Sequence, residues 1–531
     1  MREILYLLHA KVAKFAVKFT AKETLKKPRL YKYFFRKLPL NKHIMALKAI
    51  YNTSLSLLTD LYQLTMAYGY WKNNIHNKEA IFHLFYRKQP FGSGYSISAG
   101  LQPAIEYLEK LTFEDDDIEY LKTLKGNDGK ELFPVEFLKY LSEFKLELDI
   151  DAIPEGTVVF PNEPLIKVKG PLLQCQIVET ALLNIVNFQT LVATKAARIK
   201  NKANNETVME FGLRRAQGID GGLSASRASY IGGADSTSNV LAGKLFDIPI
   251  SGTHAHSWIL SFDNELDAFE AYADALPNNC VFLVDTFDTT KGIENAITVG
   301  KKLREKGKEL AGIRLDSGDL AYLSIKARKM LDNAGFPKAK VIVSNDLDEN
   351  LLRSLKSQGA KIDTWGIGTK LATAFDQPAL GGVYKLSAIK EKGKWINKIK
   401  LSEQSIKINN PGDQQVRRFY VNNKYRFDMI YDENSNIGDS PLAIDPSDST
   451  RRIKVRPHLF EYKDLLVPIF RKGKLTYSSP NLNEIRNNTL KELQKLDPSI
   501  KRLEFPHNYP VGLEESLYNT RHNLIVKLRE Q

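Results

Sequence analysis

Residues 206–385 alternate between short β-branched runs and helical patterns, and this alternation constrains the fold more than any other feature of the chain. Strand–helix units spaced by roughly 30–40 residues are typical of parallel βαβ construction. The predicted strands are 207–211, 248–251, 281–285, 313–316, 341–345 and 362–367, and the helices between most of them are 265–275, 291–305, 320–333 and 348–358. Six such strands favour a closed α/β barrel, although an open doubly wound sheet fits the same pattern.

The segments on either side of this array have a different rhythm. Residues 50–180 mix helical patterns with short strands, and beyond 385 short strands and turns prevail before a helical stretch at 482–496. We therefore predict four parts. They are a basic extension outside the core (1–49), an N-terminal α/β domain (50–180), a catalytic barrel (181–385) and a C-terminal segment that packs on the N-terminal domain (386–531).

The net charge of +14 is concentrated near the N-terminus. Residues 1–44 hold twelve Lys and Arg against two Glu, a net +10, which leaves only +4 for residues 45–531. The leader is read as an extension of the core protein, with a membrane-surface helix or an organelle address as alternatives. A nearly neutral body argues against a nucleic-acid-binding protein, which is the alternative from another functional class.

Cysteine usage and hydropathy restrict the class further. Cys175 and Cys280 are the two cysteines of the sequence, too few for a disulfide framework or a zinc cluster, which fits a reducing compartment. No stretch reaches the roughly 18–20 uncharged apolar residues that a membrane helix needs. We expect a cytoplasmic protein, with no membrane association of residues 50–531.

Polar residues or glycines follow every predicted strand, at the end where a parallel barrel carries its chemistry. Each one alone has a structural explanation, such as an aspartate that caps the next helix. Together they indicate one functional site. The residues are Arg214, Arg215, Thr253, His254, His256, Asp285, Arg314, Asp316, Asp319, Asn345, Asp346, Gly366, Gly368 and Thr369.

These residue types suit an anionic, phosphorylated sugar bound together with Mg²⁺. Arginines bind carboxylates and phosphates, and aspartates bind Mg²⁺ and ribose hydroxyls. Backbone N–H groups at a glycine-containing helix start bind phosphate, and a histidine can be a nucleophile or a general acid–base. No GxxxxGK[ST] motif is present, because Gly243-Lys244 is followed by Leu245, so ATP phosphates would not be held by a P-loop.

Eight segments in the family's order resemble the nicotinate phosphoribosyltransferase family. They are TDLYQLTMAYGYW (59–71), EFGLRRAQG (210–218), YIGGADSTSNVLAG (230–243), GTHAHSW (252–258), LVDTFDT (283–289), GIRLDSGDL (312–320), VSND (343–346) and GIGTKL (366–371). The resemblance implies a type II phosphoribosyltransferase fold, an irregular α/β barrel plus an α/β domain made from both chain ends. It also implies transfer of phosphoribose from phosphoribosyl pyrophosphate to nicotinate, the first step of NAD salvage from nicotinate, with Mg²⁺ as cofactor and ATP as co-substrate.

The resemblance also assigns roles to single residues. His256 matches the histidine that ATP phosphorylates, but the family usually has an apolar residue where His254 stands, so either imidazole of this segment is a candidate. Phe211 and Tyr62 match the aromatic pair around the pyridine ring, with Tyr62 reaching the neighbour's site in a homodimer with shared active sites. The other matches are Arg214 and Asp235 near the ring, Thr253 at the substrate, Arg314 and Asp316 around ribose and pyrophosphate, Asp285 beside the histidine, Asp285 and Asp316 as Mg²⁺ ligands, and Gly366, Gly368 and Thr369 as the 5-phosphate cradle.

Nicotinamide phosphoribosyltransferase is the alternative enzyme, with a similar fold and chemistry. The doubled arginine in FGLRRAQG and the whole segment 59–71 favour nicotinate as the substrate.

Overall fold

The computed structural model describes residues 55–404 and 407–530. The basic extension predicted at 1–49 lies outside these ranges. The described residues form one compact unit. Its described part contains three large sheets, of seven, six and six strands, and one two-stranded sheet formed by β2 (Ser96–Ile97) and β4 (Val158–Val159).

The first large sheet combines strands from the two ends of the described chain. All its pairings are antiparallel. Its order is β13 (Lys394–Asn397), β12 (Gly382–Glu391), β1 (Glu79–Tyr86), β5 (Ile166–Pro171), β3 (Asp149–Ala152), β19 (Val467–Arg471) and β20 (Lys474–Leu475). Strand β1 is buried in seven of its eight residues, as a central strand covered on both faces requires. The boundary predicted at 385 falls inside β12, so the N-terminal layer includes chain beyond it.

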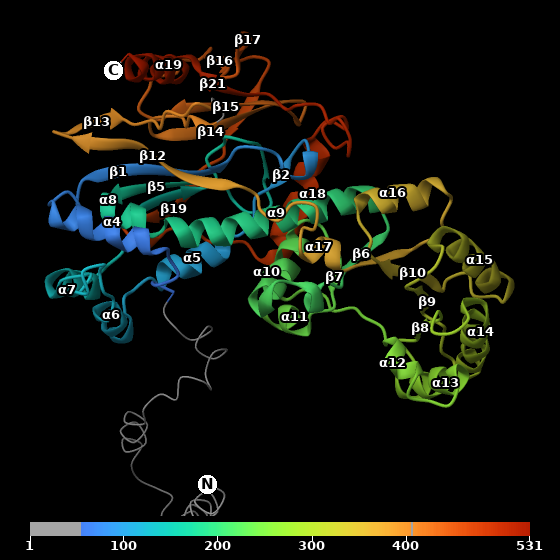
Figure 1. The fold of residues 1–531 in the computed structure, drawn as a ribbon. Helices are drawn as coiled ribbons and strands as arrows, with labels where there is room; N and C mark the ends of the chain where they lie inside the picture. The colour runs from blue at the N-terminus through green and yellow to red at the C-terminus, as the bar shows by residue number, and fades with distance from the viewer. Residues whose placement is uncertain (1–54, 405–406, 531) are drawn as a thin grey trace, which may run out of the picture. The chain divides into compact units, whose positions relative to one another are not determined.

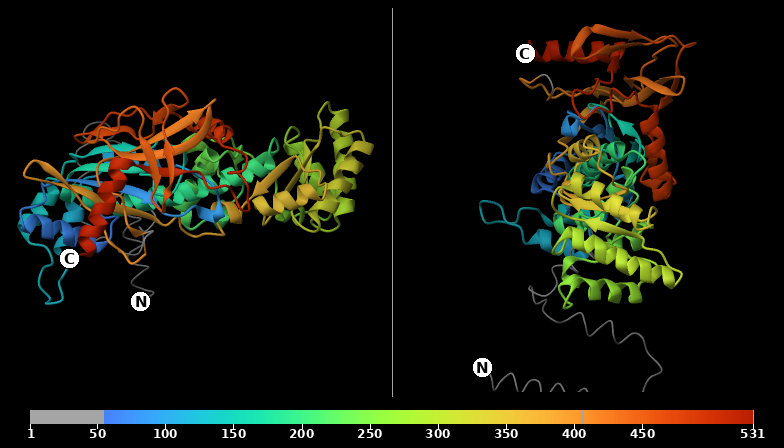
Figure 2. Two further views of the ribbon diagram at one scale, coloured as in Figure 1. Left: turned by 90° about the horizontal axis from the view of Figure 1, so that it is seen from above. Right: turned by 90° about the vertical axis from the view of Figure 1, so that its right-hand side faces the viewer.

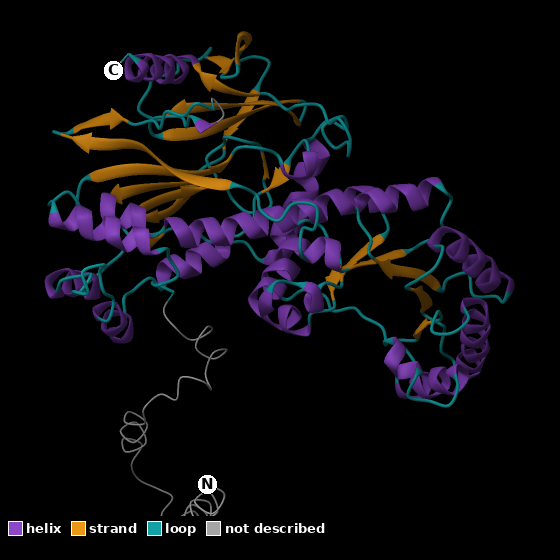
Figure 3. Ribbon diagram, viewed as in Figure 1, coloured by secondary structure: helices purple, strands orange, loops and turns teal. Residues whose placement is uncertain are grey.

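The second large sheet is parallel throughout. Its order is β7 (Ser236–Thr237), β6 (Thr207–Glu210), β11 (Thr364–Ile367), β10 (Lys340–Asn345), β9 (Gly312–Leu315) and β8 (Val281–Leu283). Helices α13 (Glu265–Ala275), α14 (Thr289–Glu305), α15 (Leu320–Asn333) and α16 (Glu349–Ser357) lie outside the arc of these strands (Figure 3). The α/β class predicted from the alternation is confirmed.

The closed barrel is not confirmed. The last strand of the array, β11, pairs with the first, β6, as in a ring, but no pairing joins β7 to β8 among the described residues. The strand predicted at 248–251 is wrong, because this segment contributes a single bridge, Thr237 to Ile250, in place of a ladder. Among the described residues, the sheet is therefore open between β7 and β8.

The third large sheet consists of C-terminal strands. Its order is β17 (Asp448–Lys454), β16 (Leu442–Asp445), β21 (Val511–Glu514), β15 (Lys424–Asp432), β14 (Gln414–Val421) and β18 (Glu461–Asp464). It has its own small apolar core, which includes Phe419, Phe427 and Met429. Figures 1 and 2 show this sheet on one face of the first sheet, with helices α4 (Leu61–Lys72), α5 (Leu101–Glu109) and α9 (Glu179–Ala203) on the other. Helices α18 (Leu482–Lys495) and α19 (Glu515–Arg529) complete this part of the chain.

Helix α9 is the central core helix of the protein. It follows α8 (Leu172–Ile177), and the stretch Leu172–Ala203 is long and apolar enough to cross a membrane by length and composition alone. However, 61% of its most apolar window is buried inside the structure. Its contacts with α10 (Gly218–Ile231), α16 and β12 explain this apolar composition by packing.

Candidate functional site at the carboxyl ends of the parallel strands

Arg314 on β9 is the centre of a hydrogen-bonded cluster at the strand ends. Its Nε donates to Ser344 Oγ at 2.7 Å, its Nη1 to Thr253 Oγ1 at 2.9 Å and its Nη2 to Asp316 Oδ1 at 2.8 Å. Only 15% of the side chain is exposed. Because parallel strands end at the same edge, residues far apart in sequence meet here. The guanidinium group is thus held by three partners from three segments.

Asp285 and Asp316 are the two carboxylates of this cluster. Asp285 Oδ2 accepts hydrogen bonds from the Asp316 backbone N–H at 2.8 Å and from Ser317 Oγ at 2.7 Å. Burial raises the pKa of Asp316, but hydrogen bonds from Ser344 and Arg314 and the charge of Arg314 outweigh it, so the pKa stays below its usual value. Asp316 is therefore an anion at neutral pH.

His256 faces both of these aspartates from the first residue of α12 (His256–Ile259). Its Nε2 lies 4.0 Å from Asp285 Oδ1 and 3.9 Å from Asp316 Oδ2, and its Nδ1 lies 3.1 Å from Thr286 Oγ1. The side chain is 40% exposed. Its imidazole is accessible from solvent and lies between two carboxylates, as an acid–base or nucleophilic group requires.

His254 occupies a different environment. It is buried, its Nε2 accepts the backbone N–H of Leu283 at 3.2 Å, and its ring packs against Phe269 and Tyr272. Burial, reinforced by the charges of Arg314 and His256, lowers its pKa to about 4, although the carbonyl of Ala255 acts in the opposite direction. These contacts favour a scaffold role for His254 and leave His256 as the accessible imidazole.

The lowered pKa of His254 predicts a pH dependence of stability. As the pH falls, the unfolded chain protonates this histidine near 6.5, whereas the folded chain resists protonation until about 4. The contribution of His254 to the free energy of unfolding is therefore complete above pH 6.5 and is lost between pH 6.5 and 4. It amounts to at most about 3 kcal/mol. Urea unfolding from pH 7 to 4 is expected to show a shallower loss for His254→Gln than for the native chain. Parallel pH profiles would contradict this.

The glycines at the end of β11 lie against Phe211. A Cβ on Gly366 would come 2.8 Å from the Phe211 ring, and one on Gly368 would come 3.2 Å from the Phe211 carbonyl oxygen. A larger residue at position 366 would collide with the Phe211 ring, which lies against the strand. Gly368 and Thr369 begin α17 (Thr369–Ala372) without a side-chain cap, so the first backbone N–H groups of this turn have no side-chain acceptor. The Arg314 guanidinium lies 5.6 Å from the centre of the same Phe211 ring.

Arg214 follows Phe211 closely in the sequence. It lies on the short helix η4 (Leu213–Arg215), and its side chain is exposed. Its guanidinium makes no hydrogen bond or ion pair with the described residues, and the same holds for Arg215. Both remain available to an anionic ligand.

Three predicted site residues lie elsewhere. Tyr62 is 47% exposed on α4 and its neighbours are Glu179, Thr180 and Asp60, so one chain does not bring it to Phe211. The resemblance places Asp235 near the pyridine ring, and the structure gives it other partners. Asp235 pairs with Lys200 and Arg486 and accepts the N–H of Val208 near the start of β6. Asp319 caps α15 through the N–H of Tyr322.

Four contributors had no role assigned from the sequence, although Ser344, Thr286 and Ser317 stand at the predicted strand ends. Ser344 joins Arg314 and Asp316, Thr286 approaches His256, and Ser317 donates to Asp285. Glu210 is buried at the end of β6, where it accepts the N–H of Gly212 and hydroxyls of Ser226 and Thr237. A carboxylate at the end of an apolar strand, next to Phe211, was a usable signal of a hydrogen-bonded cluster, because a buried carboxylate needs several donors.

The donor set is compatible with Mg²⁺. Asp285 Oδ1 is buried without a hydrogen-bond partner, and it and Asp316 Oδ2 lie at similar distances from His256. No group of three or more metal-ligating side chains occurs among the described residues. Mg²⁺ typically takes one or two protein carboxylates and completes its shell with water and substrate phosphates, so two aspartates suffice.

Comparisons with known proteins agree with this arrangement. Three family models match the chain: the nicotinate phosphoribosyltransferase N-terminal domain at 57–187, the nicotinate phosphoribosyltransferase family at 207–428 and the C-terminal domain at 413–521. Nicotinate phosphoribosyltransferase of Bacillus subtilis is 46% identical over 483 residues, covering 90% of this chain and 96% of the relative. That of Dictyostelium discoideum is 40% identical, covering 88% of each.

Solved structures show the same relationship. The crystal structure of human nicotinic acid phosphoribosyltransferase has 33% identity and a TM-score of 0.77, covering 88% of this chain and 99% of that one. Nicotinate-nucleotide pyrophosphorylase from Pyrococcus furiosus, at 21% identity and a TM-score of 0.65, shares the fold over 85% of this chain and 98% of its own. The chain belongs to the nicotinate phosphoribosyltransferase family.

Proposed function

We propose that this chain is an ATP-dependent nicotinate phosphoribosyltransferase. It would convert nicotinate, 5-phosphoribosyl 1-pyrophosphate, ATP and water into nicotinate mononucleotide, pyrophosphate, ADP and phosphate, the first step of NAD salvage from nicotinate. The observation that carries the proposal is the cluster of Arg314, Asp316, Asp285 and His256 at one edge of the parallel sheet, in a member of this family.

The chain's own residues supply binding and orientation for this transfer. The departure of pyrophosphate leaves positive charge on the ribose and negative charge on the leaving group, and a preorganised Arg314 stabilises that negative charge. The Phe211 ring offers a face on which pyridine stacks, and Arg214 offers a free guanidinium to the carboxylate. Mg²⁺, when bound, would be held by Asp285 and Asp316 and would neutralise phosphate charge.

Other features of the proposal rest on the family. The ring-like strand order, interrupted between β7 and β8, supports an irregular α/β barrel. Tyr62 is exposed and its neighbours are Asp60, Glu179 and Thr180, which supports a homodimer in which the partner subunit completes the aromatic pair. The near-neutral charge of residues 45–531 and two buried free cysteines are in keeping with a cytoplasmic enzyme.

Substrate choice tests the proposed function directly. Purified protein with phosphoribosyl pyrophosphate, Mg²⁺ and ATP is expected to form nicotinate mononucleotide from nicotinate, and to use nicotinamide far more slowly. A higher kcat/KM for nicotinamide would assign the chain to the nicotinamide enzyme instead.

His256→Ala is expected to abolish the ATP-driven enhancement while slow transfer continues. In the proposal, a phosphohistidine at His256 raises the affinity for phosphoribosyl pyrophosphate, and the coupling lies in the different affinities of the two enzyme forms. The measurement is the initial rate with and without ATP, together with phosphate incorporation. Retained coupling in this variant, with loss in His254→Ala, would reverse the assignment.

Arg214→Ala is expected to raise the KM for nicotinate by about 10-fold or more, because a charge-assisted hydrogen bond contributes roughly 1.5–3 kcal/mol. The KM for ATP should change little. Arg215→Ala is the matched control on the same turn. An unchanged KM for nicotinate would contradict the role of Arg214.

A further inference from the structure

Two adjoining cavities of the described structure lie away from the strand-end cluster. The first has a volume of about 870 Å³ and the second about 510 Å³. They share Pro161, Asn162, Ser447 and Val511, so they adjoin each other. Neither contains any of the strand-end residues. A volume near 900 Å³ is within the range of pockets that bind small organic ligands.

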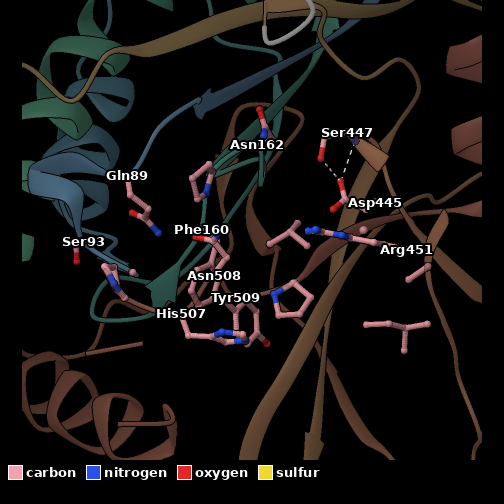
Figure 4. Close-up of a pocket in the computed structure, with 18 of the residues that line it drawn as sticks. Gln89, Ser93, Phe160, Asn162, Asp445, Ser447, Arg451, His507, Asn508 and Tyr509 are labelled. Carbon is pink, nitrogen blue, oxygen red and sulfur yellow. Dashed lines mark hydrogen bonds between the residues drawn. The ribbon is translucent and has the colours of Figure 1, made fainter. Parts of the chain in front are cut away.

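The charged lining of the first cavity is mainly cationic. The lining contains one carboxylate, Asp445, and three arginines, Arg451, Arg452 and Arg502. Figure 4 shows Asp445 bound to Ser447, whose backbone N–H and hydroxyl donate to it at 2.8 and 2.6 Å. Asp445 is thus already engaged by donors of its own loop.

The neighbouring acids leave part of this positive charge free. Arg451 reaches Asp448 at 3.2 Å, whereas Arg502 makes no hydrogen bond or ion pair with the described residues. The second cavity is lined by Arg521 and Arg529 and by no carboxylate. An anion would therefore find uncompensated guanidinium groups in both cavities.

The buried polar atoms without partners on these walls are both donors. Gln89 Nε2 lines the first cavity and Arg521 Nε lines the second. Burial lowers the pKa of Arg521, whose side chain otherwise donates only to the Ile408 carbonyl at 3.4 Å. A buried donor without an acceptor is costly. Both atoms suit a ligand that carries hydrogen-bond acceptors.

The lining of the first cavity also includes aromatic side chains. Phe505 is 94% exposed and its backbone is left-handed, with φ of 45°, a conformation that is unfavourable for a phenylalanine. Phe160 and Tyr509 stack at 3.9 Å in the same cavity. The exposed Phe505 ring offers a stacking surface for a planar base.

We propose that these adjoining cavities form an accessory binding site for a nucleotide, with its phosphates on the arginines and its base on Phe505. The site is separate from the strand-end cluster and is independent of the reaction proposed above. It is formed where the N-terminal layer meets the C-terminal sheet, by segments 89–94, 160–162, 443–453 and 502–512.

Binding of ADP to the full chain tests this site. Isothermal titration is done on an Arg314→Gln background, which weakens anion binding at the strand ends. Arg451→Glu/Arg502→Glu is expected to weaken the remaining ADP binding by about 100-fold or more, since each lost charge-assisted contact is worth at least roughly tenfold. Arg426→Glu, an exposed arginine of β15 outside both cavities, is the matched control and should bind as before.

The probes separate the parts of the proposal. Adenosine and pyrophosphate should each bind at least about tenfold more weakly than ADP, and Phe505→Ala should reduce the difference between ADP and pyrophosphate. Equal binding of pyrophosphate and ADP would overturn the nucleotide assignment. ADP affinity unchanged by the double charge reversal, or absent on the Arg314→Gln background, would overturn the site itself.

Discussion

Arg314→Ala is expected to lower kcat/KM for nucleotide formation by about 10³-fold or more. A preorganised donor to developing charge typically contributes 10²–10³-fold, and arginines that stabilise phosphoryl charge contribute about 10³–10⁵-fold. The structure adds a second reason. Ser344, Thr253 and Asp316 would each lose the partner that holds them, so the neighbouring carboxylates would also be misplaced.

Two variants separate charge from geometry in this prediction. Arg314→Lys keeps the charge but cannot reproduce three directed hydrogen bonds, so it should recover only part of the loss. Arg304→Ala removes a surface arginine of α14 that pairs with Glu309, and it should leave kcat/KM unchanged. Steady-state kinetics, with unfolding curves to show that the variants are folded, provide the measurement. Less than a tenfold loss in Arg314→Ala would contradict the central role of this group.

Much of the parallel sheet follows from local sequence because its signals are local. Short β-branched runs predicted β6, β8, β9, β10 and β11, and Asp288, Asp319 and Asp348 cap the helices that follow three of them. Closure is different, because it depends on whether two edges meet. The edge at β7 is only two residues long and adds one bridge to Ile250, and nothing in the sequence shows how many ladder bonds such an edge makes.

The site was partly predictable for the same reason. Residues at the ends of parallel strands share one edge, which placed Asp285, Arg314 and Asp316 together. His256 lies beside them although residues 248–251, which precede it, form no strand. Asp235 precedes its strand and lies with Lys200 and Arg486 near the other end. The expectation that Asp235 lies near the ring came from the resemblance, and the strand pattern alone does not show which end of a strand such a side chain reaches.

Other contributors are defined only by packing. Ser344 looks like an ordinary strand residue, and its function as a bridge between Arg314 and Asp316 depends on the neighbouring strand β9. Gly366 was interpreted as a phosphate-binding glycine, and the structure shows that the Phe211 ring also requires it to be small. Long-range contacts of this kind are set by the register between strands, which a single sequence does not specify.

Arg227→Met is expected to lower the free energy of unfolding by about 3–5 kcal/mol, the usual effect of removing one member of a buried ion pair. Arg227 is 1% exposed on α10, and both its Nη atoms donate to Glu155 at 2.7 Å. It also donates to Gln189 and Gln102 at 2.9 and 3.0 Å. Glu155 in turn accepts the N–H of Gly100 at 2.6 Å, so the pair ties α10 to the N-terminal layer.

The pH dependence distinguishes a stranded carboxylate from a simple loss of packing. Burial raises the pKa of Glu155, but the charge and hydrogen bonds of Arg227 and two backbone N–H groups outweigh it and hold the pKa below its usual value. The native chain therefore loses this contribution as the pH falls below the unfolded value. In Arg227→Met the buried carboxylate lacks its cation, so its pKa rises and acid relieves the cost.

The stability difference between Arg227→Met and the native chain should therefore narrow on going from pH 7 to pH 4, in urea unfolding experiments. Arg227→Met/Glu155→Leu removes both charges and should be more stable than the single variant at pH 7. Arg353→Ala, which breaks the exposed pair with Glu504, should change stability by less than about 1 kcal/mol. A gap that stays constant with pH would show that the loss comes from packing, because a stranded charge must titrate.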